Sequence, residues 1–442
     1  MDAREAAMLA LNAGERQGGW SEGELKKRLA AAGLDSRDAA LATRLCYGVL
    51  QNRILLDFRL GQFSRLPLGR MESKVRQILR LGACQLLFFD RIPHSAAVNS
   101  AVALTKRYSK NPRAAGMVNG VLRNLERNLD RLPAIPKGDI SEYFSILYSH
   151  PQWLVDMLLP LLGEKETEEL LTANNTPPPT SAVVNPLRTT PEALLVRLAE
   201  EGAEAELHPW LEGCLLLGKT GDLEALPAFQ QGLLHIQDPA SRLAVLASGA
   251  SPGMRVLDVC AAPGGKSFSA AMQMEGKGEV LACDLHPHKK RLLEAGARRL
   301  GLSCLTAGTA DGRVFRPEWD AAFDLVLVDA PCSGLGVIRK KPDIREKDPA
   351  ALEGLPPVQK AILANAARYV RPGGALLYST CTLLTRENED VVHGFLAERP
   401  DFKAEAFTLP GPVGVCPTGS VTLWPQRHGT DGFFLCKLRR EG

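Results

Sequence analysis

The chain has 442 residues, of which 45% are hydrophobic and 23% are charged, and these values exclude disordered, collagen-like and coiled-coil rod classes. At about 150 residues per domain, the length allows about three domains. No apolar run reaches the roughly 18 to 20 residues that cross a membrane, and Asp2, Arg4 and Glu5 do not suit a signal peptide. The ten cysteines form no Cys-x-x-Cys pair and no zinc-like spacing with histidine. We therefore expect a soluble, cytoplasmic protein without disulfides or a metal.

Positive charge is concentrated in one segment. Residues 51–138 hold 16 basic and 5 acidic side chains, whereas residues 139–442 hold 30 basic and 38 acidic ones. A basic block on a mildly acidic chain is typical of a polyanion-binding part attached to an enzyme, although a solvated helix surface gives the same count.

The first half of the chain changes pattern once. From Arg4 to about Leu129 apolar residues recur at helical spacing, and a stretch rich in proline and glycine at 132–139 follows. Residues 140–248 then mix helices expected at 153–173 and 191–201 with a strand at 181–185. We expect an all-helical domain over 1–135 and a small α+β subdomain over 140–248.

After Gly253, short apolar strands alternate with amphipathic helices. The strands are expected at 255–259, 279–283, 303–307, 323–329 and 375–380. The alternation predicts an α/β domain over 249–442, with a Rossmann-like parallel sheet covered on both faces. Ligands of such sheets bind beyond the carboxyl ends of the strands, so the residues that follow each strand are candidates for a site.

The first strand leads into a glycine-rich turn, Asp258 to Lys266. The turn differs from a phosphate-binding P-loop because Cys260 stands where that motif has glycine. Gly264 and Gly265 still allow a ligand to approach the backbone closely at the start of a helix.

Acidic residues occur at the ends of the next three strands. Asp284 ends the second strand, Asp311 follows the third and Asp329 ends the fourth. An acid after the second strand can accept hydrogen bonds from both hydroxyls of a ribose, so the series indicates a cofactor that carries adenosine.

Two cysteines follow the last two predicted strands. Cys332 comes three residues after Asp329, and Cys381 follows Thr380. A buried, inert thiol is the usual state of a cysteine. If the two strands are neighbours in the sheet, however, both thiols point into the same crevice as the cofactor.

These motifs resemble those of the RNA cytosine-C5 methyltransferases, which use S-adenosylmethionine. The resemblance rests on Asp258 to Lys266, Asp329 to Gly334, Tyr378 to Cys381, His235 to Ser241 and Asp431 to Phe434. In the N-terminal third, the segments that resemble the RNA-binding helical domain of antitermination factor NusB are Leu41 to Leu45, Gly48 to Asn52, Ile78 to Gly82 and Val118 to Arg123. The combination is similar to bacterial methyltransferases of small-subunit (16S) ribosomal RNA.

The resemblance implies a role for each motif. Cys381 is the thiolate that adds to carbon 6 of cytosine, Cys332 assists release of the methylated RNA, and Asp329 hydrogen-bonds the target ring. The implied S-adenosylmethionine site consists of Cys260, Ala261, Ala262, Pro263, Gly264, Gly265, Lys266, Asp284, Asp311 and Asp329.

Several positions near the motifs are less clear. Asn388 and Glu389 follow Cys381 closely and are candidates for bracing its loop, although an exposed helix face explains them nearly as well. The positions that depart from the family pattern are Val183, Leu335, Lys341 and Glu346, and they concern contacts to RNA rather than the thiols.

We therefore expect an enzyme that methylates carbon 5 of a specific cytosine in 16S ribosomal RNA through a covalent bond between cysteine and carbon 6. The alternatives are a transfer RNA substrate, or a non-catalytic RNA-binding assembly or antitermination factor. The intact thiol pair and cofactor acids favour the enzyme over the factor. The expected partner is small-subunit rRNA, with no membrane and no metal, and one active site within one chain permits a monomer.

Overall fold

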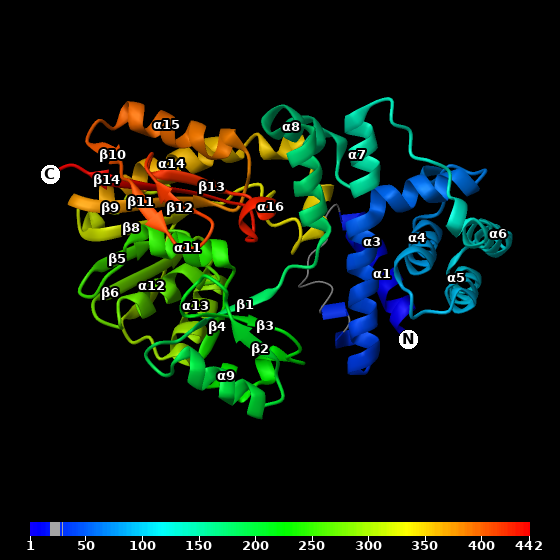
Figure 1. The fold of residues 1–442 in the computed structure, drawn as a ribbon, viewed down its shortest axis with the longest axis horizontal. Coiled ribbons are helices and arrows are strands. Elements are labelled where there is room, and N and C mark those ends of the chain that lie inside the picture. Colours follow the sequence, from blue (N-terminus) through cyan, green and yellow to red (C-terminus); the bar gives the residue numbers. More distant parts are fainter. Residues whose placement is uncertain (18–26, 29) are drawn as a thin grey trace. The chain divides into compact units, whose positions relative to one another are not determined.

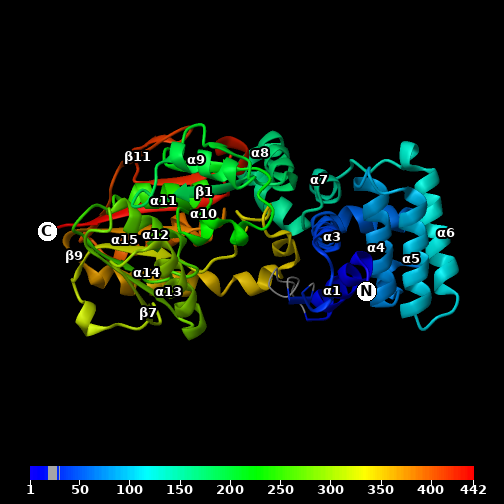
Figure 2. The same cartoon turned by 90° about the horizontal axis from the view of Figure 1, so that it is seen from below.

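The computed structural model describes residues 1–17, 27–28 and 30–442, which form two compact units (Figure 1, Figure 2). The N-terminal unit comprises residues 1–176 and 341–349, and the C-terminal unit comprises residues 177–340 and 350–442. Among the described residues, no helix is long and apolar enough to span a membrane.

The N-terminal unit is helical, as predicted. Its helices are α1 (Ala3–Gln17), α3 (Ser36–Phe63), α4 (Ser73–Phe88), α5 (His94–Tyr108), α6 (Ala114–Arg127), α7 (Ile140–Tyr148) and α8 (Gln152–Asn175). The side chains of Ile78, Leu79 and Leu122 are fully buried in its core. The absence of a side chain at Gly82 lets helices α4 and α6 approach closely. A Cβ at this position would lie only 2.5 Å from Leu122 Cδ1.

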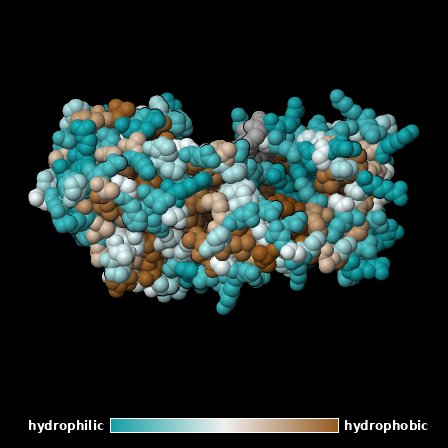
Figure 3. Space-filling model, turned by 90° about the horizontal axis from the view of Figure 1, so that it is seen from above, coloured by the Kyte–Doolittle hydropathy of each residue, from teal (hydrophilic) through white to brown (hydrophobic). Residues whose placement is uncertain are grey.

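The basic residues of this unit lie largely on its surface. Within the basic segment 51–138, the exposed ones are Arg65, Arg70, Arg91, Lys106, Arg107, Lys110, Arg113, Arg127, Arg131 and Lys137. The face of this unit seen in Figure 3, on the right, is mostly hydrophilic. Exposed cations of this density suit electrostatic attraction of a polyanion.

A segment from late in the sequence completes the N-terminal unit. Residues 341–349 include a 3-10 helix, Pro342–Glu346, whose Arg345 side chain is buried. The guanidinium of Arg345 donates to the carbonyl of Ser149 at 2.9 Å and to Asn175 Oδ1 at 2.6 Å, and it reaches three further carbonyls, of Gln51, Tyr148 and Asn174. Burial lowers the pKa of Arg345 to about 9. These hydrogen bonds explain why the segment belongs with the helices.

The C-terminal unit begins with a small antiparallel sheet in the order β2-β3-β1-β4. Its strands are β1 (Thr180–Val184), β2 (Ala205–Leu207), β3 (Cys214–Leu217) and β4 (Leu234–Ile236), and its helices are α9 (Pro191–Glu200) and α10 (Pro227–Gln230). Leu194 and Leu198 of α9 are buried against this sheet. The mixed helix and strand pattern expected here is present.

An eight-stranded sheet follows, in the order β10-β14-β9-β8-β5-β6-β7 with β13 beside β14. Its strands are β5 (Arg255–Asp258), β6 (Glu279–Asp284), β7 (Leu305–Thr309), β8 (Phe323–Asp329), β9 (Val370–Thr380), β10 (Phe402–Ala404), β13 (Ser420–Leu423) and β14 (Phe433–Arg440). Strands β7, β6, β5, β8 and β9 are parallel, as predicted, and β14 joins β9 antiparallel. A separate hairpin pairs β11 (Phe407–Leu409) with β12 (Gly414–Cys416).

Helices cover both faces of the large sheet. One apolar core joins it to α11 (Pro239–Ser248), α12 (Gly265–Gln273) and α13 (Pro287–Leu300). The other joins it to α14 (Leu355–Tyr369) and α15 (Glu389–Glu398), and α16 (Pro425–His428) is a single turn. The predicted doubly covered α/β fold is confirmed.

The division into units differs from the predicted boundaries in one respect. The segment 132–139 has no helix, as expected of a linker, but α7 and α8 pack with the N-terminal unit rather than with the small sheet. The carbonyls that end α7 and α8 bind Arg345, which ties both helices to residues 341–349. This attachment joins residues far apart in the sequence, so local pattern cannot reveal it.

Replacing Arg345 by methionine should destabilise the N-terminal unit by roughly 2 to 4 kcal/mol, because several buried acceptors lose their donor at once. The midpoint of thermal unfolding, followed by circular dichroism, measures the effect. Arg53→Met is the matched control, because Arg53 pairs with Glu346 at 2.7 Å but stays partly exposed, and such pairs contribute at most about 1 kcal/mol. Equal midpoint losses in the two variants would contradict the role given to Arg345.

Candidate active site

The pairing of β8 with β9 brings the two predicted cysteine loops together. The strands are parallel neighbours, with Asp329 opposite Ser379, so their carboxyl ends coincide. Cys332 and Cys381 follow these ends, and their Sγ atoms lie 3.3 Å apart. The hydrogen bond between the two thiols and burial raise the pKa of Cys332 well above that of a free thiol. The prediction that both thiols share one crevice required the two strands to be neighbours. Strands β8 and β9 are neighbours in the sheet.

The turn between β5 and α12 has a conformation that requires glycine. Gly264 has φ +116°, and a Cβ on it would lie 2.3 Å from Phe268 Cζ. A Cβ on Gly296 of α13 would lie 2.4 Å from the same ring atom. Phe268 therefore fills the space beneath the turn and fixes its path at the edge of the sheet.

A cavity of about 350 Å³ lies beside this turn, at the carboxyl ends of β5, β6 and β8. Five predicted site residues line it, namely Cys260, Ala262, Asp284, Asp311 and Asp329. The other predicted turn residues, Ala261, Pro263, Gly264, Gly265 and Lys266, are not on its wall. They shape the turn or, for Lys266, contact a wall residue.

Two of the wall carboxylates have basic partners that the sequence analysis missed. Asp284 is buried, accepts from the backbone N–H of His286 at 3.2 Å and pairs with Lys289 at 3.4 Å. Asp311 pairs with Arg313 at 2.7 Å, and this pairing lowers the pKa of Asp311. Lys289 and Arg313 each follow the carboxylate they pair with by at most five residues. This short spacing in the sequence could have predicted both ion pairs.

Lys266 and Asp329 form an ion pair of 2.7 Å between the turn and the end of β8. The Lys266 side chain is only 6% exposed, and its Nζ lies 4.8 Å from the centroid of the Phe433 ring. Asp329 also accepts from Ser379 Oγ at 3.1 Å. The Asp329 carboxylate is thus held by two donors while it faces the cavity.

Two buried residues after Cys381 support both thiol loops. Glu387 Oε2 accepts from the backbone N–H of Ser333 and from Gln359 Nε2, each at 2.9 Å, while Glu387 Oε1 is buried with no hydrogen-bond partner. Asn388 accepts from Thr380 Oγ1 at 2.5 Å and donates to the carbonyl of Thr382 at 3.1 Å, so it spans Cys381. Asn388 braces this loop, whereas Glu387 was not among the predicted residues.

A group of four charges fixes the chain that follows Cys332. Arg339 donates to Asp431 at 2.6 Å, and Lys340 pairs with Asp431 at 2.7 Å and with Asp238. Burial and the nearby Asp238 raise the pKa of Asp431 to about 6. Asp238 and Asp431 come from two separate sequence motifs, and these contacts join them to one loop.

The four positions that depart from the family pattern lie outside the cavity. Leu335 and Val183 are buried, Lys341 begins the segment attached to the N-terminal unit, and Glu346 pairs with Arg53.

Asp258, at the end of β5, is fully buried and accepts from Ser267 Oγ at 2.6 Å. Burial raises its pKa from 3.8 to about 7. The folded state therefore binds this proton more tightly than the unfolded state, and stability falls as the pH rises from about 3.8 to about 7.

In Asp258→Asn the loss of stability with rising pH should disappear. The asparagine side chain stays neutral at every pH and keeps the Ser267 hydrogen bond. Thermal midpoints from pH 4 to pH 8 should show the variant gaining on the native chain with rising pH. Asp311→Asn is the control, since the pKa of Asp311 is lowered from 3.8 and its stabilisation is lost only below about pH 3.8, so this variant should differ from the native chain by a constant amount from pH 4 to pH 8. An Asp258→Asn difference that is constant across this range would refute the assignment.

Comparison with known proteins agrees with the predicted relationship. Residues 245–439 match the family 16S rRNA methyltransferase RsmB/F, residues 1–127 match the NusB family, and residues 150–224 match a ferredoxin-like domain of RsmF/B-like methyltransferases. The chain is 37% identical to the probable ribosomal RNA small subunit methyltransferase B of Bacillus subtilis, with 99% of each chain covered. It is 33% identical to the protein of the same name from Synechocystis, with 100% of each covered.

A solved structure has the same fold over the full length. The crystal structure of PH0851 covers 99% of this chain and 98% of its own, with a TM-score of 0.81 and 26% identity. The chain belongs to the 16S rRNA methyltransferase RsmB/F family and is an S-adenosylmethionine-dependent methyltransferase.

Proposed function

We propose that this protein methylates carbon 5 of a cytosine in 16S ribosomal RNA through a covalent bond between Cys381 Sγ and carbon 6 of the ring. The observation that carries the proposal is the 3.3 Å separation of two thiols beside a carboxylate that also lines a ligand cavity. The names of the full-length relatives support ribosomal rather than transfer RNA.

The cavity fits the cofactor by its donor set. Asp284 is a buried acceptor suited to ribose hydroxyls, and Cys260, Val358 and Ile362 give the opposite region an apolar wall. The volume of about 350 Å³ lies within the usual range of about 300 to 1,000 Å³ for small-molecule sites. S-adenosylmethionine supplies an electrophilic methyl group when it is bound there.

Chemistry at a ring carbon explains why thiols are needed. Carbon 5 of cytosine is a poor nucleophile, but addition of the Cys381 thiolate at carbon 6 makes an enamine whose carbon 5 can attack a methyl group. After methyl transfer, a base or a water molecule takes the proton from carbon 5, the electrons of that bond re-form the double bond between carbons 5 and 6, and sulfur leaves carbon 6 as the Cys381 thiolate.

Cys332 and Asp329 serve this sequence in different ways. The hydrogen bond between the thiols and their burial keep one thiol of the pair protonated beside the other, and we assign release to Cys332 because its motif carries that role in the resembling family. Asp329, held by Lys266 and Ser379, can accept from the amino group of cytosine, whereas uracil presents only an oxygen at that edge.

Cys381→Ala should abolish transfer of labelled methyl from S-adenosylmethionine to protein-free 16S rRNA. Cys332→Ala should instead accumulate a protein–RNA adduct that survives denaturing electrophoresis, because addition proceeds and release does not. Calorimetric binding of S-adenosylhomocysteine should be unchanged in both variants. The reverse pattern, with the adduct in Cys381→Ala, would exchange the two roles, and no transfer by the native chain would refute the proposed reaction.

Glu387→Gln should also accumulate adduct, because the charged acceptor that holds the Ser333 N–H next to Cys332 is lost. We expect roughly a tenfold slower release, since hydrogen bonds to charged groups contribute about 1.5 to 3 kcal/mol. The matched control is Glu389→Gln, since Glu389 accepts from Thr422 Oγ1 at 3.2 Å rather than from the Ser333 N–H, and it should leave release unchanged. Slower methyl transfer without adduct in Glu387→Gln would mean a general loss of structure instead.

A further inference from the structure

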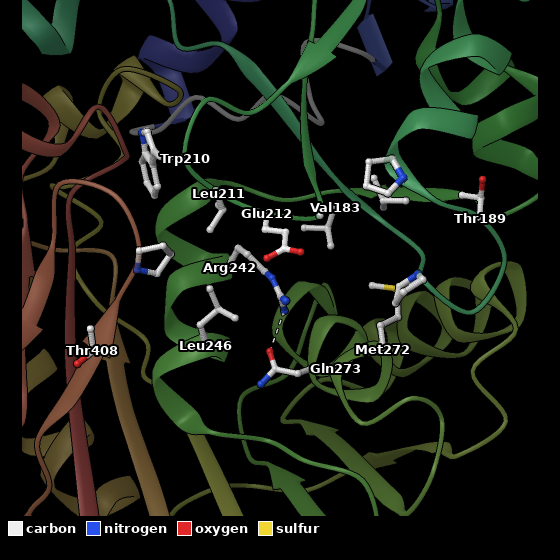
Figure 4. Close-up of a pocket in the computed structure, with 15 residues that line it drawn as sticks. Val183, Thr189, Trp210, Leu211, Glu212, Arg242, Leu246, Met272, Gln273 and Thr408 are labelled. Carbon is white, nitrogen blue, oxygen red and sulfur yellow. Dashed lines mark hydrogen bonds between the residues drawn. The ribbon is translucent and has the colours of Figure 1, made fainter.

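A second cavity, of about 570 Å³, lies in the C-terminal unit and shares no residue with the cofactor cavity. Its walls come from the small sheet, from α11 and α12, and from the region of β11. Figure 4 shows Trp210, Leu211 and Leu246 on one side and Met272 on the other. Most of its wall is apolar, and its volume lies in the range of about 300 to 1,000 Å³ that holds small ligands.

One cation occupies the centre of this apolar space. Arg242 extends from α11 between the walls, and its Nη1 donates to Gln273 Oε1 at 3.1 Å (Figure 4). Its Nε is buried and has no hydrogen-bond partner. No ion pair of Arg242 occurs within the part of the chain that the structure describes, and burial lowers the pKa of Arg242.

Two other arginines of low exposure differ from Arg242 in the number of backbone acceptors they reach, although the Nε of Arg345 is also buried without a partner among the described residues. Arg299 donates to the carbonyls of Phe229 and Leu234, and Arg345 donates to five acceptors. A buried guanidinium without an anion costs free energy, and an apolar side chain of similar size would pack in its place without this cost. Arg242, with one acceptor inside the described chain, therefore keeps donor capacity for a ligand in this cavity.

The lining of the cavity suits a ligand that carries both an anionic group and a planar or apolar group. A guanidinium with free donors binds phosphate in a bidentate manner. Trp210 lines the cavity, where Gly411 packs against its ring, and an aromatic wall beside a cation is how proteins hold unpaired nucleotides. Gln273, Thr408 and Glu212 add polar groups that can meet the edge of a base.

We propose that this cavity binds one unpaired nucleotide of the RNA substrate, with its phosphate at Arg242 and its base against the apolar wall that includes Trp210. The assignment rests on the proposed function, because it is RNA that supplies the nucleotide. It gives the C-terminal unit an RNA contact apart from the thiols and from the basic helical unit.

The test compares the native chain with Arg242→Met in methyl transfer to 16S rRNA and in RNA binding by fluorescence anisotropy. We expect KM to rise about tenfold with kcat unchanged, and the slope of log affinity against log salt to become shallower by about 0.7, the value for one phosphate of a single strand. Binding of S-adenosylhomocysteine should be unchanged. Thermal stability should stay level or increase, since an unpaired buried charge is removed.

Two further variants separate the cavity from a general charge effect. Arg197→Met removes the same charge from the same unit at an arginine already paired with Glu201, and it should leave KM unchanged. Leu246→Phe narrows the cavity but keeps the charge of Arg242, and it should raise KM as Arg242→Met does. Equal KM values for the native chain, Arg242→Met and Leu246→Phe would overturn the inference.

The source of the nucleotide is tested with cytidine and adenosine monophosphates at millimolar concentration. A rise in the thermal midpoint of the native chain that Arg242→Met lacks, without any effect of that variant on RNA, would overturn the assignment to RNA in favour of a free nucleotide. If the native chain transfers no methyl group, the proposed function fails. The anisotropy comparison still decides whether the cavity binds RNA.

Discussion

The parallel pairing of β8 with β9 is the constraint on which the site depends. Because Asp329 lies opposite Ser379, the loops that begin at the two strand ends start side by side, and each carries one cysteine. A shift of this register by one residue would turn every side chain of one strand to the other face of the sheet. The 3.3 Å separation of Cys332 and Cys381 is therefore set by backbone hydrogen bonds, and Glu387 and Asn388 then hold the loops in place.

Several carboxylates around this site have a lysine partner. Lys266 neutralises Asp329, Lys289 pairs with Asp284, and Lys340 serves both Asp238 and Asp431. Each pairing keeps a carboxylate oriented at a place where solvation is weak, and burial of a paired group costs less than burial of a single charge. Within the part of the chain that the structure describes, Arg242 has neither a carboxylate partner nor a set of backbone acceptors, and it lines a cavity, which is why it points to a ligand.

The sequence predicted those features that depend on local periodicity and on the ends of strands. Strands β5, β6 and β8 lie within one residue of their predicted bounds, and Asp284, Asp311 and Asp329 meet at one cavity, because carboxyl ends of parallel strands share an edge. Strand β9 begins at Val370 rather than 375, since its first residues also pair with β8. Strand β14 was not predicted, because nothing in its own residues specifies an antiparallel partner.

What the sequence could not predict depends on contacts between distant segments. The attachment of residues 341–349 needs one arginine to meet carbonyls of residues 51, 148, 149 and 174, and no spacing in the sequence records that meeting. The same segment contains Lys341 and Glu346, so two departures from the family pattern occur where the chain leaves the C-terminal unit. Of the two, Glu346 pairs with Arg53 of α3, so its role is set by packing on the helices. The catalytic motif at Cys332 and this attached segment lie only a few residues apart in the chain, yet they satisfy different physical requirements: one positions a thiol, and the other joins the chain to a helical unit.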